Sequence, residues 1–133
     1  MTHATGSFEV TITPQPADDY ADGQSLGRLT IDKTFSGDLV AASKGQMLTA
    51  MSAVKGSAGY VAIERVTGTL AGREGSFVLQ HSGTMARGTS SLALDVVPDS
   101  GTGGLAGIVG SMSIDVSDGK HAYGFDYTLP DAA

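Results

Sequence analysis

Histidine and other ionisable side chains interrupt the apolar faces of several expected strands. His81 shares a face with Phe77 and Leu79, and His121 shares one with Phe125. An imidazole in such a position is either a satisfied core residue or an acid, base or ligand contact. The residues expected to lie closest to any bound molecule are Arg65, His81, His121 and Tyr123, followed by Lys33 and Glu64.

Charged residues in this set have two interpretations. Lys33 falls between Ile31 and Phe35 at period two, while Glu64 and Arg65 are adjacent on one strand. Neighbours on a strand point to opposite faces, so only one of Glu64 and Arg65 can face inward. Either the strands end near these charges, which are then solvated, or the charges form an internal polar cluster that orients a ligand.

A hairpin expected around residues 71–75 places two of these side chains together. A turn centred on Gly72 and Arg73 sets Arg65 directly opposite His81. Two potential cations side by side repel each other unless an anion lies between them. A ligand carboxylate or a water cluster could fill that place, and Glu64 could do so only if the register shifts.

Other kinds of catalytic chemistry find little support. The chain has no cysteine, which removes thiolate metal sites and thiol nucleophiles. The two inward histidines lack further ligands, so no metal site and no cofactor are expected. Residues 101–106 fit a dinucleotide-binding pattern, but the following residues alternate like a strand instead of starting a helix. No catalytic residue is assigned.

Alternation of apolar and polar residues with period two runs through most of the chain and indicates strands. Expected strands include residues 60–70, 76–85, 91–97 and 111–116, with Asp118-Gly119 as a hairpin turn. For residues 44–59 a strand followed by a loop is favoured over a short helix. Residues 17–27 are expected to form a loop.

These segments predict an all-β fold with about eight antiparallel strands in one domain over residues 1–133. A closed barrel is the favoured architecture, and a two-sheet β-sandwich is the alternative. The residues expected to be buried hold the apolar positions of alternating strands: Phe8, Val10, Ile12, Leu29, Ile31, Phe77, Leu79, Leu94, Ile114 and Phe125.

Composition limits the classes of partner. A net charge of −6 with eight scattered basic residues argues against nucleic acid and against a polybasic membrane surface. The first residues lack the basic and apolar regions of a signal peptide, and no apolar run is long enough to span a bilayer. We therefore expect a cytoplasmic protein.

Three blocks carry a resemblance to a known family: KGSAGYVAIERVTGTL at 55–70, GSFVLQHSGTM at 75–85 and PDSGTGGLAG at 98–107. Together they resemble a bacterial family catalogued as a domain of unknown function. That family is grouped with the barrels of plant allene oxide cyclase and the dirigent proteins. The resemblance implies an eight-stranded antiparallel barrel, often oligomeric, that binds an apolar small molecule and in some relatives steers a cyclisation or coupling.

Two hypotheses for function follow. The first is a binding or cyclase-like barrel for a small, mostly apolar molecule. The second is a non-catalytic module with a solidly packed barrel that acts through self-association or a protein partner. A hollow interior with converging polar groups favours the first, and an interior filled by Phe, Leu and Met favours the second.

Overall fold

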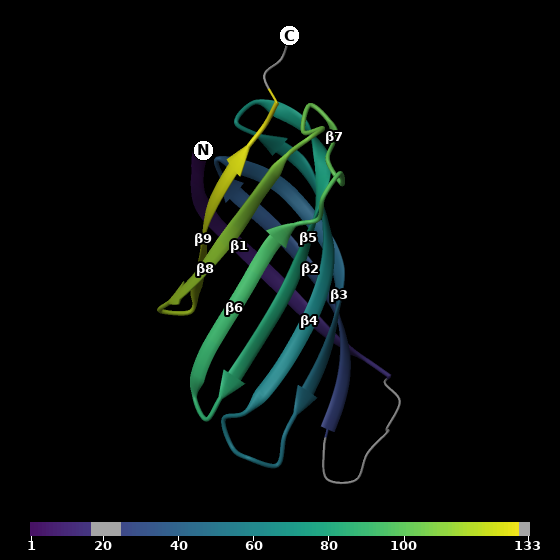
Figure 1. Ribbon diagram of the computed structural model, residues 1–133, viewed down its shortest axis with the longest axis vertical. Helices are drawn as coiled ribbons and strands as arrows, with labels where there is room; N and C mark the ends of the chain where they lie inside the picture. The colour runs from purple at the N-terminus through teal and green to yellow at the C-terminus, as the bar shows by residue number, and fades with distance from the viewer. Residues whose placement is uncertain (17–24, 131–133) are drawn as a thin grey trace.

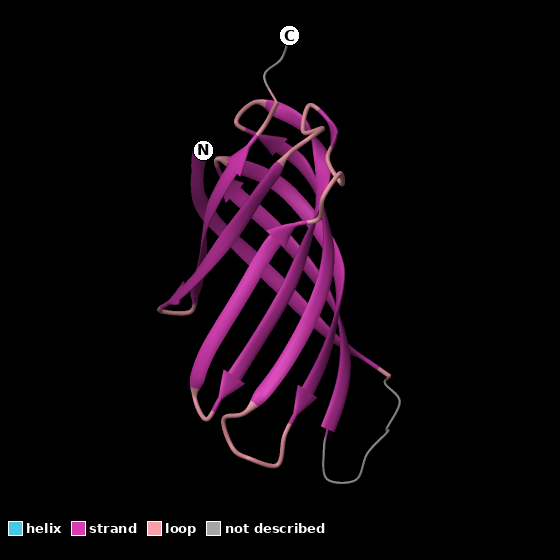
Figure 2. Cartoon of the chain, viewed as in Figure 1, coloured by secondary structure: helices cyan, strands magenta, loops and turns pink. Residues whose placement is uncertain are grey.

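The computed structural model describes residues 1–16 and 25–130, which form nine strands. In chain order these are β1 (Thr2–Gln15), β2 (Ser25–Gly37), β3 (Leu39–Met51), β4 (Ala58–Leu70), β5 (Arg73–Ala86), β6 (Thr89–Val96), β7 (Thr102–Gly103), β8 (Val109–Ser117) and β9 (Lys120–Thr128). Strands and loops make up this whole part of the chain (Figure 2). It contains no helix suited to crossing a membrane.

Eight of the strands close into an antiparallel barrel. Following the hydrogen-bonded neighbours gives the order β4-β3-β2-β1-β9-β8-β6-β5, and the pairing of β4 with β5 closes the ring (Figure 1). The ninth strand, β7, is a two-residue addition beside the start of β5. The all-β prediction and the preference for a barrel over a sandwich are therefore confirmed.

The turn between β4 and β5 is shorter than the sequence interpretation assumed. Leu70 pairs with Arg73, so the turn consists of Ala71 and Gly72 alone. Both residues have positive φ, 49° and 83°, as a two-residue hairpin with the handedness of a twisted sheet requires. The resulting register sets Arg65 opposite Val78 and His81 opposite Ala62. The predicted pairing of Arg65 with His81 is wrong.

One end of the barrel is packed with apolar side chains, and we call it the closed end. Leu39, Leu70 and Phe77 have no exposed surface there, and the loop after β7 adds Leu105 and Ile108, each 1% exposed. In Figure 1 this loop lies at the top of the barrel. The glycine-rich segment that resembles a nucleotide loop in sequence therefore supplies part of the core.

The wall of the barrel is incomplete towards the other end. β1 pairs with β9 only as far as Phe8, and β6 pairs with β8 at the single position Asp95–Ser111. The β8–β9 hairpin therefore ends well above the β5–β6 hairpin in Figure 1. We call this lower region, where β1 and β6 each lack a partner on one side among the described strands, the open end.

The predicted core differs from the observed one at the open end. Phe8, Ile31, Phe77, Leu79, Leu94 and Phe125 are buried as expected. Val10, Leu29 and Ile114 are only partly buried, and Ile12 is 47% exposed. Ile12 pairs with the buried Ile31 and so faces inward, but beyond Phe8 no described strand pairs with β1 on its other side. The prediction that it is buried is wrong because alternation reports the direction of a side chain and not what covers it.

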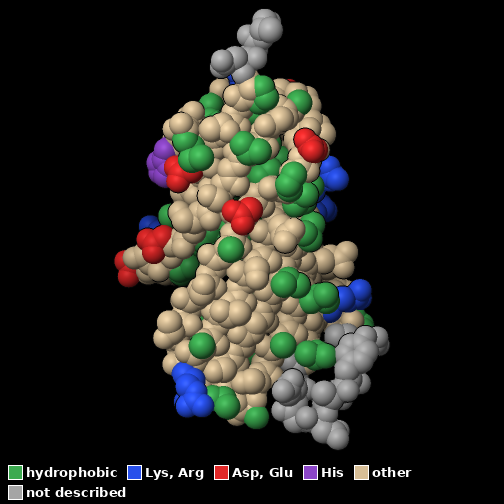
Figure 3. Space-filling model, viewed as in Figure 1, with side chains coloured by type: hydrophobic (Ala, Val, Ile, Leu, Met, Phe, Trp, Pro, Cys, Tyr) green, Lys and Arg blue, Asp and Glu red, His purple; other side chains and the backbone are tan. Residues whose placement is uncertain are grey.

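Charged and apolar side chains both occur on the outer surface. On the face drawn in Figure 3, acidic and basic side chains are scattered among uncharged ones and form no single patch. Several apolar side chains also point outward, including Val40, Leu48, Val61 and Ile63, each about half exposed or more.

Candidate functional site

Glu64 is the only acidic side chain that lies fully inside the barrel among the described residues. It occupies an inward position of β4, and its neighbour Arg65 points outward and is exposed. Gly45 on β3 faces Glu64, and a Cβ atom there would lie 2.6 Å from the Cβ of Glu64. The glycine therefore gives this inward carboxylate the room it needs.

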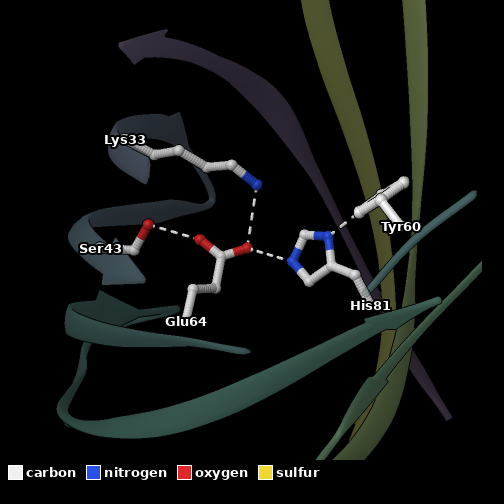
Figure 4. Close-up of polar contacts among 5 residues, drawn as sticks. All are labelled: Lys33, Ser43, Tyr60, Glu64 and His81. Atoms are coloured by element: carbon white, nitrogen blue, oxygen red, sulfur yellow. Dashed lines mark hydrogen bonds and ion pairs between the residues drawn. The ribbon is translucent and has the colours of Figure 1, made fainter. Parts of the chain in front are cut away.

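Three side chains from three other strands donate hydrogen bonds to the Glu64 carboxylate (Figure 4). The Lys33 ammonium on β2 lies 2.9 Å from Oε1, and Nε2 of His81 on β5 lies 2.5 Å from the same oxygen. The Ser43 hydroxyl on β3 donates to Oε2 at 2.5 Å. All four side chains are at most 6% exposed, so the polar cluster is internal.

The cluster keeps Glu64 ionised. Burial would raise the pKa of this carboxyl, but the hydrogen bond from His81, the charge of Lys33 and the hydrogen bond from Ser43 outweigh it and lower the pKa to about 2. Lys33 is also held over the ring of Phe8, with Nζ 4.8 Å from the ring centroid. The carboxylate thus has the paired charge and multiple donors that a buried anion requires.

Tyr60 extends the cluster towards the open end. Its hydroxyl lies 3.5 Å from Nδ1 of His81, and the two rings meet edge-on with centroids 6.2 Å apart. The Tyr60 ring lies over Gly83, where an added Cβ would be 2.3 Å from a ring carbon. Burial raises the pKa of the Tyr60 hydroxyl, and the charge of Glu64 raises it further, so the group remains a hydrogen-bond donor.

The structure brings together half of the residues expected from the sequence. Lys33, Glu64 and His81 form the cluster, whereas Arg65 is on the outer face and its predicted inward position is wrong. His121 is partly buried against Phe8, with ring centroids 5.1 Å apart.

Tyr123 has a different environment from the one expected. Its hydroxyl donates to the carbonyl of Ser36 at 2.8 Å and accepts from the amide of Leu39 at 2.9 Å. These bonds link the turn between β2 and β3 to β9. The hydroxyl is committed to the backbone, so its observed contacts support a structural role.

Two members of the site, Ser43 and Tyr60, were missed by the sequence interpretation. A lone serine on a strand carries no specific chemical signal. Ser43 does lie in an inward series of small residues with Ala41 and Gly45, which leaves space for a larger group from the next strand. Tyr60 shares the period-two face of Glu64, and that relationship could have identified it.

The cluster can serve both a structural and a binding role. As a closed network it ties β2, β3, β4 and β5 together, and no buried side-chain polar atom in the described part of the chain lacks a partner. In addition, Tyr60 and Nδ1 of His81 place one donor and one acceptor on the side nearest the open end. No group of three or more potential metal ligands occurs within residues 1–16 and 25–130.

Comparison with known proteins finds a matching family and a similar crystal structure. Residues 4–127 match the profile of a family described as protein of unknown function (DUF3224). A crystal structure of a DUF3224 protein of unknown function from Shewanella oneidensis MR-1 is similar over 99% of both chains, with 53% sequence identity and a TM-score of 0.95. No curated protein matches the chain.

Proposed function

Starting from the fact that the chain belongs to the DUF3224 family, whose description gives no function, we propose that this barrel binds a small, mostly apolar, uncharged molecule at its open end. One observation carries the proposal. Inward-facing apolar side chains at that end are exposed to solvent: Ile12 by 47%, Leu92 by 44% and Met85 by 43%.

These exposures are unusual for inward positions. Leu92 pairs with the inward Gly83, and Met85 with the inward Ala58, so both point to the same side of the sheet as His81. Inward side chains of a filled barrel are covered by their neighbours, as Phe77 and Leu79 are. When an apolar molecule covers apolar surface that is open to water inside a barrel, the burial favours binding by about 25 cal/mol per Å² of surface covered.

The charges nearby favour a neutral ligand. Glu64 is compensated by Lys33, and each of its oxygens already accepts a hydrogen bond. A ligand ion would therefore enter apolar surroundings without a free counter-charge, which is costly. The Tyr60 hydroxyl and Nδ1 of His81 offer a donor and an acceptor on this side of the cluster, which suits a single hydroxyl or carbonyl group on the ligand.

Titration with N-phenyl-1-naphthylamine, a neutral apolar dye, tests the proposal. Its fluorescence should rise on binding to the native protein, and Leu92→Glu should weaken binding by about 10-fold or more because it places a charge against the dye. Val40→Glu changes an outward residue that is 61% exposed and should bind normally. Absence of binding, or equal loss in both variants, would contradict the proposal.

A second candidate function, self-association, rests on a different surface. Leu48 and Val61 are cross-strand partners on the outer face of β3 and β4, and Ile63 follows on the same face. Their exposures are 56%, 51% and 49%. Covering this apolar group with a second copy of the chain would stabilise a dimer. Light scattering that gives the monomer mass of 13.5 kDa at high concentration would exclude it.

A further inference from the structure

The two ring nitrogens of His81 have unequal partners. Nε2 lies 2.5 Å from a Glu64 oxygen, and an ionised carboxylate can only accept a hydrogen bond. Nε2 therefore carries the proton, and in the neutral imidazole Nδ1 has a free lone pair. The contact of Nδ1 is the Tyr60 hydroxyl at 3.5 Å, the outer limit of a hydrogen bond.

A carboxylate behind an imidazole has a defined chemical effect. It fixes the tautomer and orientation of the ring, and it stabilises the imidazolium that forms when the other nitrogen accepts a proton. Here Lys33 and Ser43 also hold the carboxylate, so Glu64 is ionised and oriented before any ligand arrives. The Glu64–His81 pair, which we call the dyad, is therefore preorganised as a base.

Access to this base comes from the open end. Along β5 the inward positions run from His81 through Gly83 to Met85, which is 43% exposed. The Tyr60 ring lies over Gly83 and is partly exposed. Because its hydroxyl is only loosely bonded to His81, a modest turn of the ring would open Nδ1 to a bound molecule and leave the phenol beside it as a donor.

We propose that the Glu64–His81 dyad is a general base for a neutral carbon acid bound at the open end, with the Tyr60 hydroxyl as the donor to the developing oxyanion. The ligand class is an apolar molecule with a C–H bond next to a carbonyl group. This inference rests on the proposed binding function and adds a reaction to it.

The reaction is a proton shift that balances without a co-reactant. The C–H bond next to the carbonyl breaks, its proton passes to Nδ1 of His81, and its electron pair moves into the enolate, whose oxygen accepts a hydrogen bond from Tyr60. The imidazolium then returns the proton to the same carbon or to a conjugated one. Return to a conjugated carbon isomerises the molecule. Return to the same carbon, after the imidazolium proton has exchanged with water, replaces the hydrogen of that carbon with one from solvent.

Hydrogen exchange of 2-indanone in D₂O, followed by the loss of its α-proton NMR signals, measures this step directly. The protein should accelerate exchange above the rate given by an equal concentration of free imidazole. His81→Gln should lower that acceleration by about 100-fold or more, the usual contribution of a positioned base. Tyr60→Phe leaves the dyad intact and should lower it by about 10-fold or more through loss of the oxyanion donor.

A second histidine–carboxylate pair in the same chain is the matched control. Nδ1 of His3 lies 2.5 Å from Asp126, but both side chains are more than half exposed on the outside of the barrel. His3→Gln should retain the full rate. Equal loss in His3→Gln and His81→Gln, or a native rate no higher than that of imidazole, would overturn the inference.

Displacement of the naphthylamine dye by 2-indanone, measured on the same samples, separates this inference from the binding proposal. If the ketone displaces the dye without exchanging, the base is disproved and the binding site stands. If the dye itself does not bind and no exchange occurs, both are disproved. If His81→Gln fails to fold, Tyr60→Phe decides the matter, because an unchanged rate in that folded variant would overturn the proposed donor and with it the inference.

Discussion

His81 and Glu64 are hydrogen-bonded at 2.5 Å although they are not cross-strand partners, because Glu64 pairs with Leu79 and His81 pairs with Ala62. They are diagonal neighbours on the inward face, within reach because both side chains are long. The two-residue turn at Ala71 and Gly72 determines this relationship. A turn longer by one residue would change the register and could send one of the two side chains to the outer face.

The first prediction concerns acid stability. The pKa of Glu64 is lowered from 4.5 to about 2 in the folded protein, so the unfolded chain binds the proton more readily. The stabilisation from this group is therefore complete above pH ~5 and is lost as the pH falls towards 2, to a total of about 3 kcal/mol. The free energy of unfolding from urea titrations at several pH values measures it.

Glu64→Gln provides the comparison for that measurement. The variant cannot titrate at this position, so its free energy of unfolding should fall less steeply between pH 5 and 2 than that of the native protein. All other acidic groups are common to both proteins and cancel in the difference. Parallel pH curves would show that the Glu64 carboxyl has the same pKa in the folded and unfolded chains.

A second prediction concerns the coupling of Lys33 and Glu64. Lys33→Met leaves a buried carboxylate without its full counter-charge and should cost about 3 kcal/mol or more. Adding Glu64→Gln removes that charge, so the double variant should be less destabilised than the sum of the two single variants. Urea unfolding of all four proteins completes the cycle. Additive effects would mean that the 2.9 Å ion pair contributes no coupling energy.

Much of this fold could be predicted from the sequence because strand direction depends on local alternation. Alternation predicts strands over residues 76–85 and 91–97 and places His81 on an inward face, and the structure has β5 and β6 there. Register is different, because it depends on turn length. The sequence predicts a turn over residues 71–75, whereas only two residues form it. The longer turn shifts the register, so Arg65 instead of Glu64 becomes the expected neighbour of His81.

The site itself was harder to predict than the strands. Lys33 and Glu64 are far apart in sequence, and their contact depends on how β2, β3 and β4 align when the sheet closes. Ser43 gave no chemical signal until that alignment was known. The exposure of Ile12 was unpredictable for a related reason: the pairing of β1 with β9 stops at Phe8, and nothing in the alternation of β1 marks that point.

A third prediction concerns the glycine beneath Tyr60. In Gly83→Ala the new methyl group would lie 2.3 Å from a Tyr60 ring carbon, so the ring must turn away. Gly83 has ordinary backbone angles, and the change should otherwise be tolerated. We expect the 3.5 Å contact between Tyr60 and His81 to be lost while the Glu64 cluster persists. A crystal structure or the NMR shifts of the Tyr60 ring would show it, and an unmoved ring would contradict it.

The last prediction compares two buried tyrosines of β9. The Tyr123 hydroxyl bonds to Ser36 and Leu39, and Tyr123→Phe would leave the buried Leu39 amide without its acceptor. An unsatisfied buried donor costs about 1–3 kcal/mol, and the lost bond to Ser36 adds to that, so we expect about 2 kcal/mol or more. Tyr127 is equally buried as a residue at 4% exposure, but its hydroxyl makes none of the hydrogen bonds between described residues and therefore reaches solvent, because no buried polar atom there lacks a partner. Tyr127→Phe should therefore change the free energy of unfolding by about 0.5 kcal/mol or less. Equal losses in the two variants would mean that ring packing, and not the hydroxyl bridge between β9 and the β2–β3 turn, makes Tyr123 important.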